Sequence, residues 1–136
     1  MRVRISNILK TIVINRAGNR CEYCLVPKIL SNFEFHIEHV VSIQHGGTSL
    51  PDNLAYCCSF CNWKKGTNLA TLILPNDEMI RIFNPRKQNW QEHFSTVAGK
   101  IIPLSKTGVA TAQLLEFNLP ERVEVRLELA KAGFYP

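Results

Sequence analysis

The chain has 136 residues, of which 46% are hydrophobic and 20% charged, and its formal net charge is +5. This composition is too apolar for a disordered chain, and the length suits one compact core with a smaller appendage. No apolar run approaches the eighteen or so residues that a membrane helix needs, so we expect a soluble cytoplasmic protein with no membrane partner.

The first half of the chain predicts a helix followed by a strand–loop–strand–helix unit, because short apolar segments alternate there with turn signals. The expected elements are a helix over residues 5–16, a strand over 32–41, a loop over 42–53, a strand over 54–57 and a helix over 59–65. The turn signals are Gly18, His45-Gly46-Gly47, Pro51-Asp52-Asn53 and Gly66. Such a unit has little core of its own, so a bound metal would supply much of its stability.

The second half predicts two hairpins followed by two helices. The expected elements are a hairpin of strands 71–75 and 79–83, a hairpin of strands 94–97 and 100–104, and helices over 107–117 and 120–131. Pro120 stands at the first position of the last helix and Gly133 follows its end. We therefore expect a core of residues 1–70 and an extension of mixed helices and strands, residues 71–136, packed on it.

Four of the five cysteines form two Cys-x-x-Cys pairs, Cys21/Cys24 and Cys58/Cys61. Each such turn presents two thiolates to one tetrahedral zinc ion, and in a reducing compartment this pattern favours metal binding over disulfides. The 33 residues between the pairs exceed the 15–20 of a compact zinc ribbon, which indicates an inserted functional loop. A redox pair is the alternative, but it needs only one copy of the motif. Cys57 is expected to be a small buried apolar residue.

Between the cysteine pairs, Glu38 and His39 end the first predicted strand, and Asn62 directly follows the last cysteine. Carboxylate and amide oxygens suit a hard divalent ion, and an imidazole can take a proton from water near neutral pH. Adjacent side chains of a regular strand point to opposite faces, so Glu38 and His39 could not both reach one ion. The strand must therefore end or bulge at this pair. Each of these residues also has a structural explanation. Glu38 and His39 could be an ordinary surface pair of a strand, and Asn62 could cap the helix that follows. Asn53 could be a turn residue, and its bonds to nearby backbone would also hold the loop that follows His39 in place.

The positive charge is concentrated in one part of the chain. Residues 1–100 hold 12 Lys and Arg against 7 Asp and Glu, whereas residues 101–136 hold four of each. Such an excess favours a polyanionic partner. Arg20, Lys64 and Lys65 are the candidates for phosphate contact, with a solvated basic face as the alternative.

These motifs together resemble bacterial HNH endonucleases that have a four-cysteine zinc site. The resemblance covers residues 16–68 and rests on Arg20-Cys21-Glu22-Tyr23-Cys24, His36-Ile37-Glu38-His39, His45-Gly46-Gly47, Asn53-Leu54 and Cys58-x-x-Cys61-Asn62-x-x-Lys65-Gly66. A later string, Phe83-Asn84-Pro85-Arg86 with Trp90 and His93-Phe94, resembles the C-terminal extension of some of these proteins. The resemblance implies an α+β fold with a ββα-metal, treble-clef-like core, and metal-dependent cleavage of DNA, which we expect to be double-stranded.

The resemblance also implies a role for each residue of the motif. By position, His39 is the general base and Asn53 is the middle residue of the motif. Glu38, commonly Asp in the family, and Asn62, often His, would hold a catalytic Mg²⁺ or Mn²⁺. The four paired cysteines would hold a structural Zn²⁺. Ser42 stands where Pro is frequent, and this departure loosens the expected loop.

Two rival functions use fewer of these features. A non-catalytic, zinc-dependent nucleic-acid-binding module needs the cysteine pairs and the basic surface but has no use for Glu38, His39 and Asn62 together. A thiol oxidoreductase would use one cysteine pair and leave the other idle.

Overall fold

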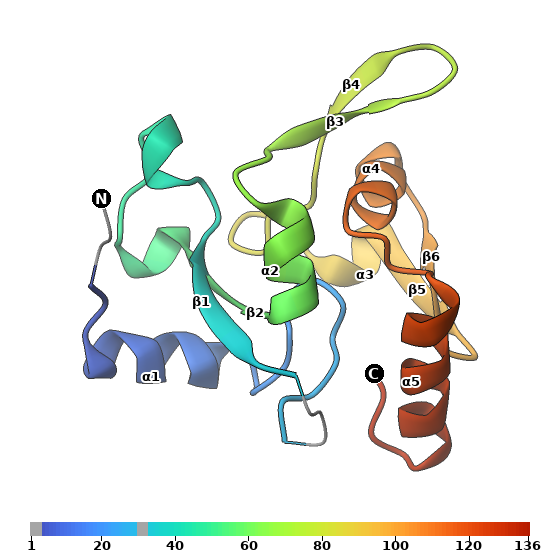
Figure 1. Ribbon diagram of the computed structural model, residues 1–136, viewed down its shortest axis with the longest axis horizontal. Coiled ribbons are helices and arrows are strands. Elements are labelled where there is room, and N and C mark those ends of the chain that lie inside the picture. Colours follow the sequence, from blue (N-terminus) through green and yellow to red (C-terminus); the bar gives the residue numbers. More distant parts are fainter. Residues whose placement is uncertain (1–3, 30–32) are drawn as a thin grey trace.

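The structure, a computed structural model, describes residues 4–29 and 33–136. Its helices are α1 (Asn7–Arg16), α2 (Ser59–Lys65), α3 (Trp90–His93), α4 (Lys106–Leu114) and α5 (Pro120–Lys131). Its strands are β1 (Phe35–His39), β2 (Leu54–Cys58), β3 (Ala70–Ile73), β4 (Glu78–Arg81), β5 (Phe94–Val97) and β6 (Lys100–Pro103). α1 and the β1–β2 hairpin lie at one end of the molecule, α4 and α5 lie at the other, and α2 lies between them (Figure 1). None of the described helices is long and apolar enough to span a membrane.

The α+β class is confirmed, and the helices and strands predicted from the sequence are all present in the predicted order, with α3 inserted before β5. β1 is shorter than the expected strand over residues 32–41, and Asn32, its expected first residue, lies outside the described residues. The loop between β1 and β2 contains two short 3₁₀ turns, Ile43–His45 and Pro51–Asn53. α3 was not predicted, because a single helical turn is too short to produce a periodic apolar pattern.

The β1–β2 hairpin and α2 form the unit that carries the motif residues. β1 and β2 are antiparallel, with His36 opposite Cys57 and Glu38 opposite Ala55. α2 follows β2 without a linker, because the Cys58 thiolate at its N-cap accepts the backbone N–H of Cys61.

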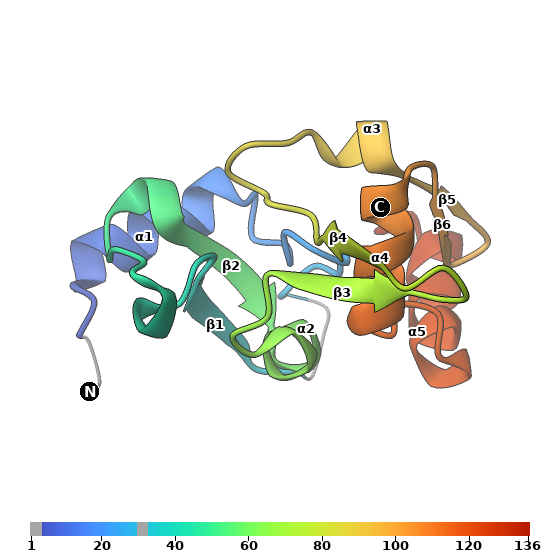
Figure 2. The same ribbon diagram turned by 90° about the horizontal axis from the view of Figure 1, so that it is seen from above.

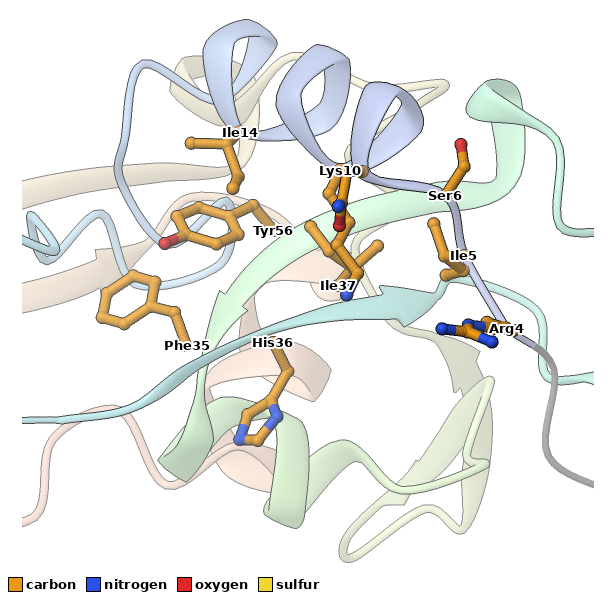
Figure 3. Close-up of a pocket in the computed structure, with 10 residues that line it drawn as sticks. Arg4, Ile5, Ser6, Lys10, Ile14, Phe35, His36, Ile37 and Tyr56 are labelled. Carbon is orange, nitrogen blue, oxygen red and sulfur yellow. The ribbon is translucent and has the colours of Figure 1, made fainter.

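The two faces of β1 pack against different helices. On one face, Phe35 and Ile37 pack against the cluster that contains Val13 of α1. Glu38 lies on the other face and meets Lys65 of α2. Figure 3 shows the same alternation, with Ile37 pointing toward α1 and His36 pointing to the opposite side of the strand.

The larger hydrophobic core joins the two halves of the chain. It contains Tyr23 and Cys57 from the first half, and Phe83, Phe94 and Phe117 from the second. The rings of Tyr23 and Phe83 meet edge to face with centroids 6.5 Å apart. Cys57 is fully buried, as predicted. The division of the chain at residue 70 stays a prediction.

Among the described residues, the strands form three separate two-stranded antiparallel sheets. The β3–β4 hairpin extends away from α2 and passes beside α4 (Figure 2). The β5–β6 hairpin packs against α4 and α5. The extension therefore builds its own small layer of helices and hairpins on one side of the HNH-like unit.

Candidate metal centre and active site

The four paired cysteines converge on one point. Cys21, Cys24, Cys58 and Cys61 are all buried, and their sulfur atoms lie within 4.8 Å of one another. The Sγ atoms of Cys24 and Cys58 are 3.8 Å apart, which is about the separation that tetrahedral coordination with bonds of about 2.3 Å requires. The backbone N–H groups of Cys24 and Cys61 each donate to the first sulfur of their pair at 3.4 Å. This set of donors fits zinc and leaves no position open for a substrate.

A cation from the extension lies against this cluster. Nη2 of Arg122, in α5, donates to Sγ of Cys61 at 3.2 Å. Its guanidinium lies 4.1 Å from the centroid of the Phe60 ring, and its Nη1 donates to the carbonyl oxygens of Leu115 and Glu116. Four thiolates around a divalent ion would carry a net negative charge, so this cation would stabilise the site when a metal is bound. The cysteine spacing could not predict Arg122, because it lies 61 residues beyond Cys61.

The extension also satisfies the backbone of the first cysteine turn. The hydroxyl of Tyr135 donates to the carbonyl oxygen of Cys24 at 2.7 Å. Nε1 of Trp90 donates to the carbonyl oxygen of Tyr23 at 2.8 Å. Buried carbonyl groups need such partners, so the extension contributes directly to the geometry of this turn.

Glu38 is held inside the protein by two donors. Its side chain is 6% exposed, its Oε1 accepts the hydroxyl of Tyr23 at 2.6 Å, and its Oε2 lies 3.7 Å from Nζ of Lys65. Burial raises the pKa of Glu38 to about 7, against the opposing effects of the Lys65 charge and the Tyr23 hydrogen bond. Tyr23, which the sequence did not single out, thus connects the first cysteine turn to the motif carboxylate.

His39 is the last residue of β1, so the strand ends at the Glu38-His39 pair, as predicted. Its Nε2 lies 2.9 Å from Oγ of Ser49, in the loop that follows. Partial burial, and secondarily the charge of Lys65, lower the pKa of His39. The ring is therefore mainly neutral at pH 7 and can accept a proton.

Asn53 fixes the loop that follows His39. Its Oδ1 accepts the backbone N–H of Val41 at 3.0 Å, and its Nδ2 donates to the carbonyl oxygens of Val41 and Thr48 at 2.9 and 2.8 Å. Gly47 lies so close to this contact that a Cβ there would be 1.8 Å from the carbonyl oxygen of Val41. These bonds are of the side-chain-to-backbone kind that the sequence predicted for Asn53.

Asn62 is half-buried in α2, one turn before Lys65. Residues three apart share a face of a helix, so Asn62 lies on the side of α2 from which Lys65 reaches Glu38. His36 shares the face of β1 that carries Glu38. Strand alternation and helix spacing therefore place Glu38 and His36 on the face of β1, and Asn62 on the face of α2, that meet at the Glu38–Lys65 pair, whereas Nε2 of His39 contacts Ser49 in the loop.

The three basic residues expected to contact phosphate make contacts within the protein. Arg20 donates to the backbone carbonyl oxygens of Leu25 and Phe134. Lys64 forms an ion pair with Glu116 at 2.9 Å. The side chain of Lys65 is only 1% exposed. Glu38 is the charged partner of this buried amino group, and phosphate contact by the three residues stays a prediction.

Residues 21–68 match the family model described as HNH endonuclease. The matched segment contains both cysteine pairs, the Glu38-His39 pair, Asn53 and Asn62. It is an HNH domain of the type with four cysteines positioned to bind a metal, which confirms the resemblance seen in the sequence. The match supports a nuclease or other nucleic-acid-related function with metal binding. No curated protein and no solved structure matches the chain significantly.

Proposed function

We propose that the protein is an endonuclease that hydrolyses phosphodiester bonds of double-stranded DNA, with His39 as the general base. The observation that carries this proposal is the neutral, partly exposed imidazole at the end of β1, directly after a carboxylate and within the HNH segment. Ser49 orients the ring, and Asn53 fixes the loop that positions Ser49. A general base of this kind contributes about 10²–10⁴-fold to the rate.

Glu38 and Asn62 would hold the catalytic Mg²⁺ or Mn²⁺. Held by these two oxygens, a divalent ion would supply positive charge to offset the charge on the scissile phosphate and the leaving oxygen. A carboxylate offers about four lone-pair sites, so its contacts with Tyr23 and Lys65 leave others for a ligand bond. The charge of Lys65 favours the ionised carboxylate that a metal needs.

The four cysteines would hold zinc in a structural role. The convergence of both pairs on one point supports this assignment over a thiol oxidoreductase, which uses a single pair. A well-folded protein in which elemental analysis finds no zinc would overturn it.

The test of the proposed function compares His39→Ala with His36→Ala on supercoiled plasmid, with and without added Mn²⁺. His39→Ala removes the proton acceptor but none of the proposed metal ligands. We expect it to keep its zinc and DNA affinity while cleavage falls by roughly 10²–10⁴-fold. His36→Ala, three residues earlier on β1, should be much milder. Wild-type cleavage by the His39 variant would exclude this residue as the base.

A non-catalytic nucleic-acid-binding module is the second candidate. The burial of Glu38 beside Lys65 favours it, because a catalytic carboxylate is ordinarily more accessible to its metal. The same plasmid experiment separates the two functions. DNA binding without any Mn²⁺- or Mg²⁺-dependent nicking by the wild-type protein would establish the binding module.

A further inference from the structure

A groove with a volume of about 930 Å³ lies between the start of α1 and the β1–β2 hairpin (Figure 3). Arg4 and Lys10 contribute its charged side chains, and both are exposed. Phe35, Ile37 and Tyr56 supply apolar and aromatic surface. The family match and the four-cysteine site do not include α1, so the α1 side of the groove lies outside them, whereas Phe35, His36, Ile37 and Tyr56 on its other side belong to the matched segment.

The charge of this groove suits an anionic ligand. Among the described residues that line it, none carries a carboxylate. The first turn of α1, a helix of ten residues, also holds no acidic side chain, so its N–H groups add to the positive potential. The charges of Arg4 and Lys10 and the partial positive charge at the N-terminal end of α1 therefore all attract an anion.

The groove also leads toward His39. Alternation along β1 places Phe35, Ile37 and His39 on the same face of the strand, the face that lies toward α1. Ile37 and His39 are two positions apart on the strand, a distance of about 7 Å. Successive phosphates of one DNA strand are about 3.4 Å apart along the helix axis, so this distance corresponds to about two base-pair steps.

We propose that this groove binds the sugar–phosphate backbone of DNA on the side of β1 that carries His39. Arg4 and Lys10 contact phosphates, and the apolar floor formed by Phe35 and Ile37 packs against the sugars. The assignment rests on the proposed nuclease function. It places the DNA contact between the start of α1 and β1, in contrast to Arg20, Lys64 and Lys65, whose charged groups bind other parts of the protein.

The test is the salt dependence of binding to a fluorescent DNA duplex, measured by anisotropy without added divalent ions so that no cleavage occurs. Arg4→Ala combined with Lys10→Ala should reduce the slope of log K against log salt by about two units, because each lost phosphate contact removes about 0.9. The control is Lys100→Ala with Lys131→Ala, which removes the same charge from exposed lysines of β6 and α5. The control pair should keep the wild-type slope.

An unchanged slope in the groove variant, or an equal loss in the control pair, would overturn the groove assignment. Zinc content and thermal unfolding of both variants establish that they are folded. Plasmid cleavage by the wild-type protein decides the proposed function separately. If the wild-type protein cuts plasmid and the groove variant keeps the wild-type slope, the nuclease assignment stands and only the groove assignment is wrong.

Discussion

At the scale of single residues, Glu38 and Lys65 depend on each other. Both side chains are almost completely buried, and each is the charged partner of the other. An isolated buried charge is costly, so removal of one partner is far more destabilising than removal of a surface ion pair. Lys64 and Glu116 provide that comparison, because their ion pair is partly exposed and Lys64 directly precedes Lys65 in α2.

Lys65→Met should therefore lower the free energy of unfolding by about 3–5 kcal/mol, whereas Lys64→Met should change it by less than about 1 kcal/mol. The pKa of Glu38 is already raised, so its contribution to stability is fully present below about pH 4.5 and is lost as the pH rises through about 7. Without the charge of Lys65 the pKa of Glu38 should rise further. The destabilisation of Lys65→Met relative to the wild-type protein should therefore be larger at higher pH. Urea unfolding at pH 5 and pH 8 measures both effects, and equal destabilisation by the two variants would contradict the buried pair.

The pH dependence of cleavage should change with the concentration of metal. A proton and a divalent ion compete for Glu38, whose pKa of about 7 puts this competition near neutrality. At limiting Mn²⁺ the rate should fall as the pH drops through about 7. At saturating Mn²⁺ the fall should move to lower pH and be set by His39, whose pKa lies below its ordinary value of about 6.5. Profiles that superimpose at both concentrations would show that Glu38 binds no catalytic metal.

At the scale of elements, the loop between β1 and β2 is organised by one side chain. Asn53 makes three hydrogen bonds to the backbone at Val41 and Thr48 and so joins the two ends of the loop. The same loop carries Ser49, the partner of His39. A loosened loop should therefore displace the imidazole without disturbing the four cysteines, which lie outside it.

Asn53→Ala should lower the free energy of unfolding by about 1–3 kcal/mol, because it leaves backbone groups at Val41 and Thr48 without partners. It should also slow cleavage while zinc content stays at the wild-type level. Asn68→Ala is the control, since the Asn68 side chain makes a single bond to the carbonyl oxygen of Lys65 near the surface. If Asn53→Ala cleaved at the wild-type rate, the loop would not position His39.

Local signals in the sequence were sufficient for most elements and for the convergence of the four paired cysteines. The Cys-x-x-Cys spacing and the glycine after α2 act over a few residues, so they predicted the cysteine cluster and the end of the helix. Burial of Glu38 could not be predicted in this way, because it depends on Tyr23 and Lys65, 15 and 27 residues away along the chain. The contact of Arg122 with Cys61 spans 61 residues and carries no sequence signature.

At the scale of the whole molecule, the extension and the HNH domain share the cysteine cluster. Arg122, Trp90 and Tyr135 all come from the extension, and each donates a hydrogen bond to one of the two cysteine turns. The HNH segment of residues 21–68 therefore lacks part of the environment of its own metal site. Stability of the zinc site should depend on a helix that lies far outside the family match.

Arg122→Gln should weaken zinc binding by about 10–100-fold, the range typical of residues that support metal ligands. Its guanidinium donates to Sγ of Cys61, and a neutral amide cannot offset the negative charge of four thiolates. Arg126→Gln is the matched control, because Arg126 is buried in the same helix but donates to the oxygens of Gly99, Phe117 and Asn118 and to no sulfur. Both variants should lose stability, whereas only Arg122→Gln should release zinc faster to a chromogenic chelator under conditions where the protein stays folded. Equal release rates in the two variants would mean that the extension supports the fold alone and leaves the metal site unchanged.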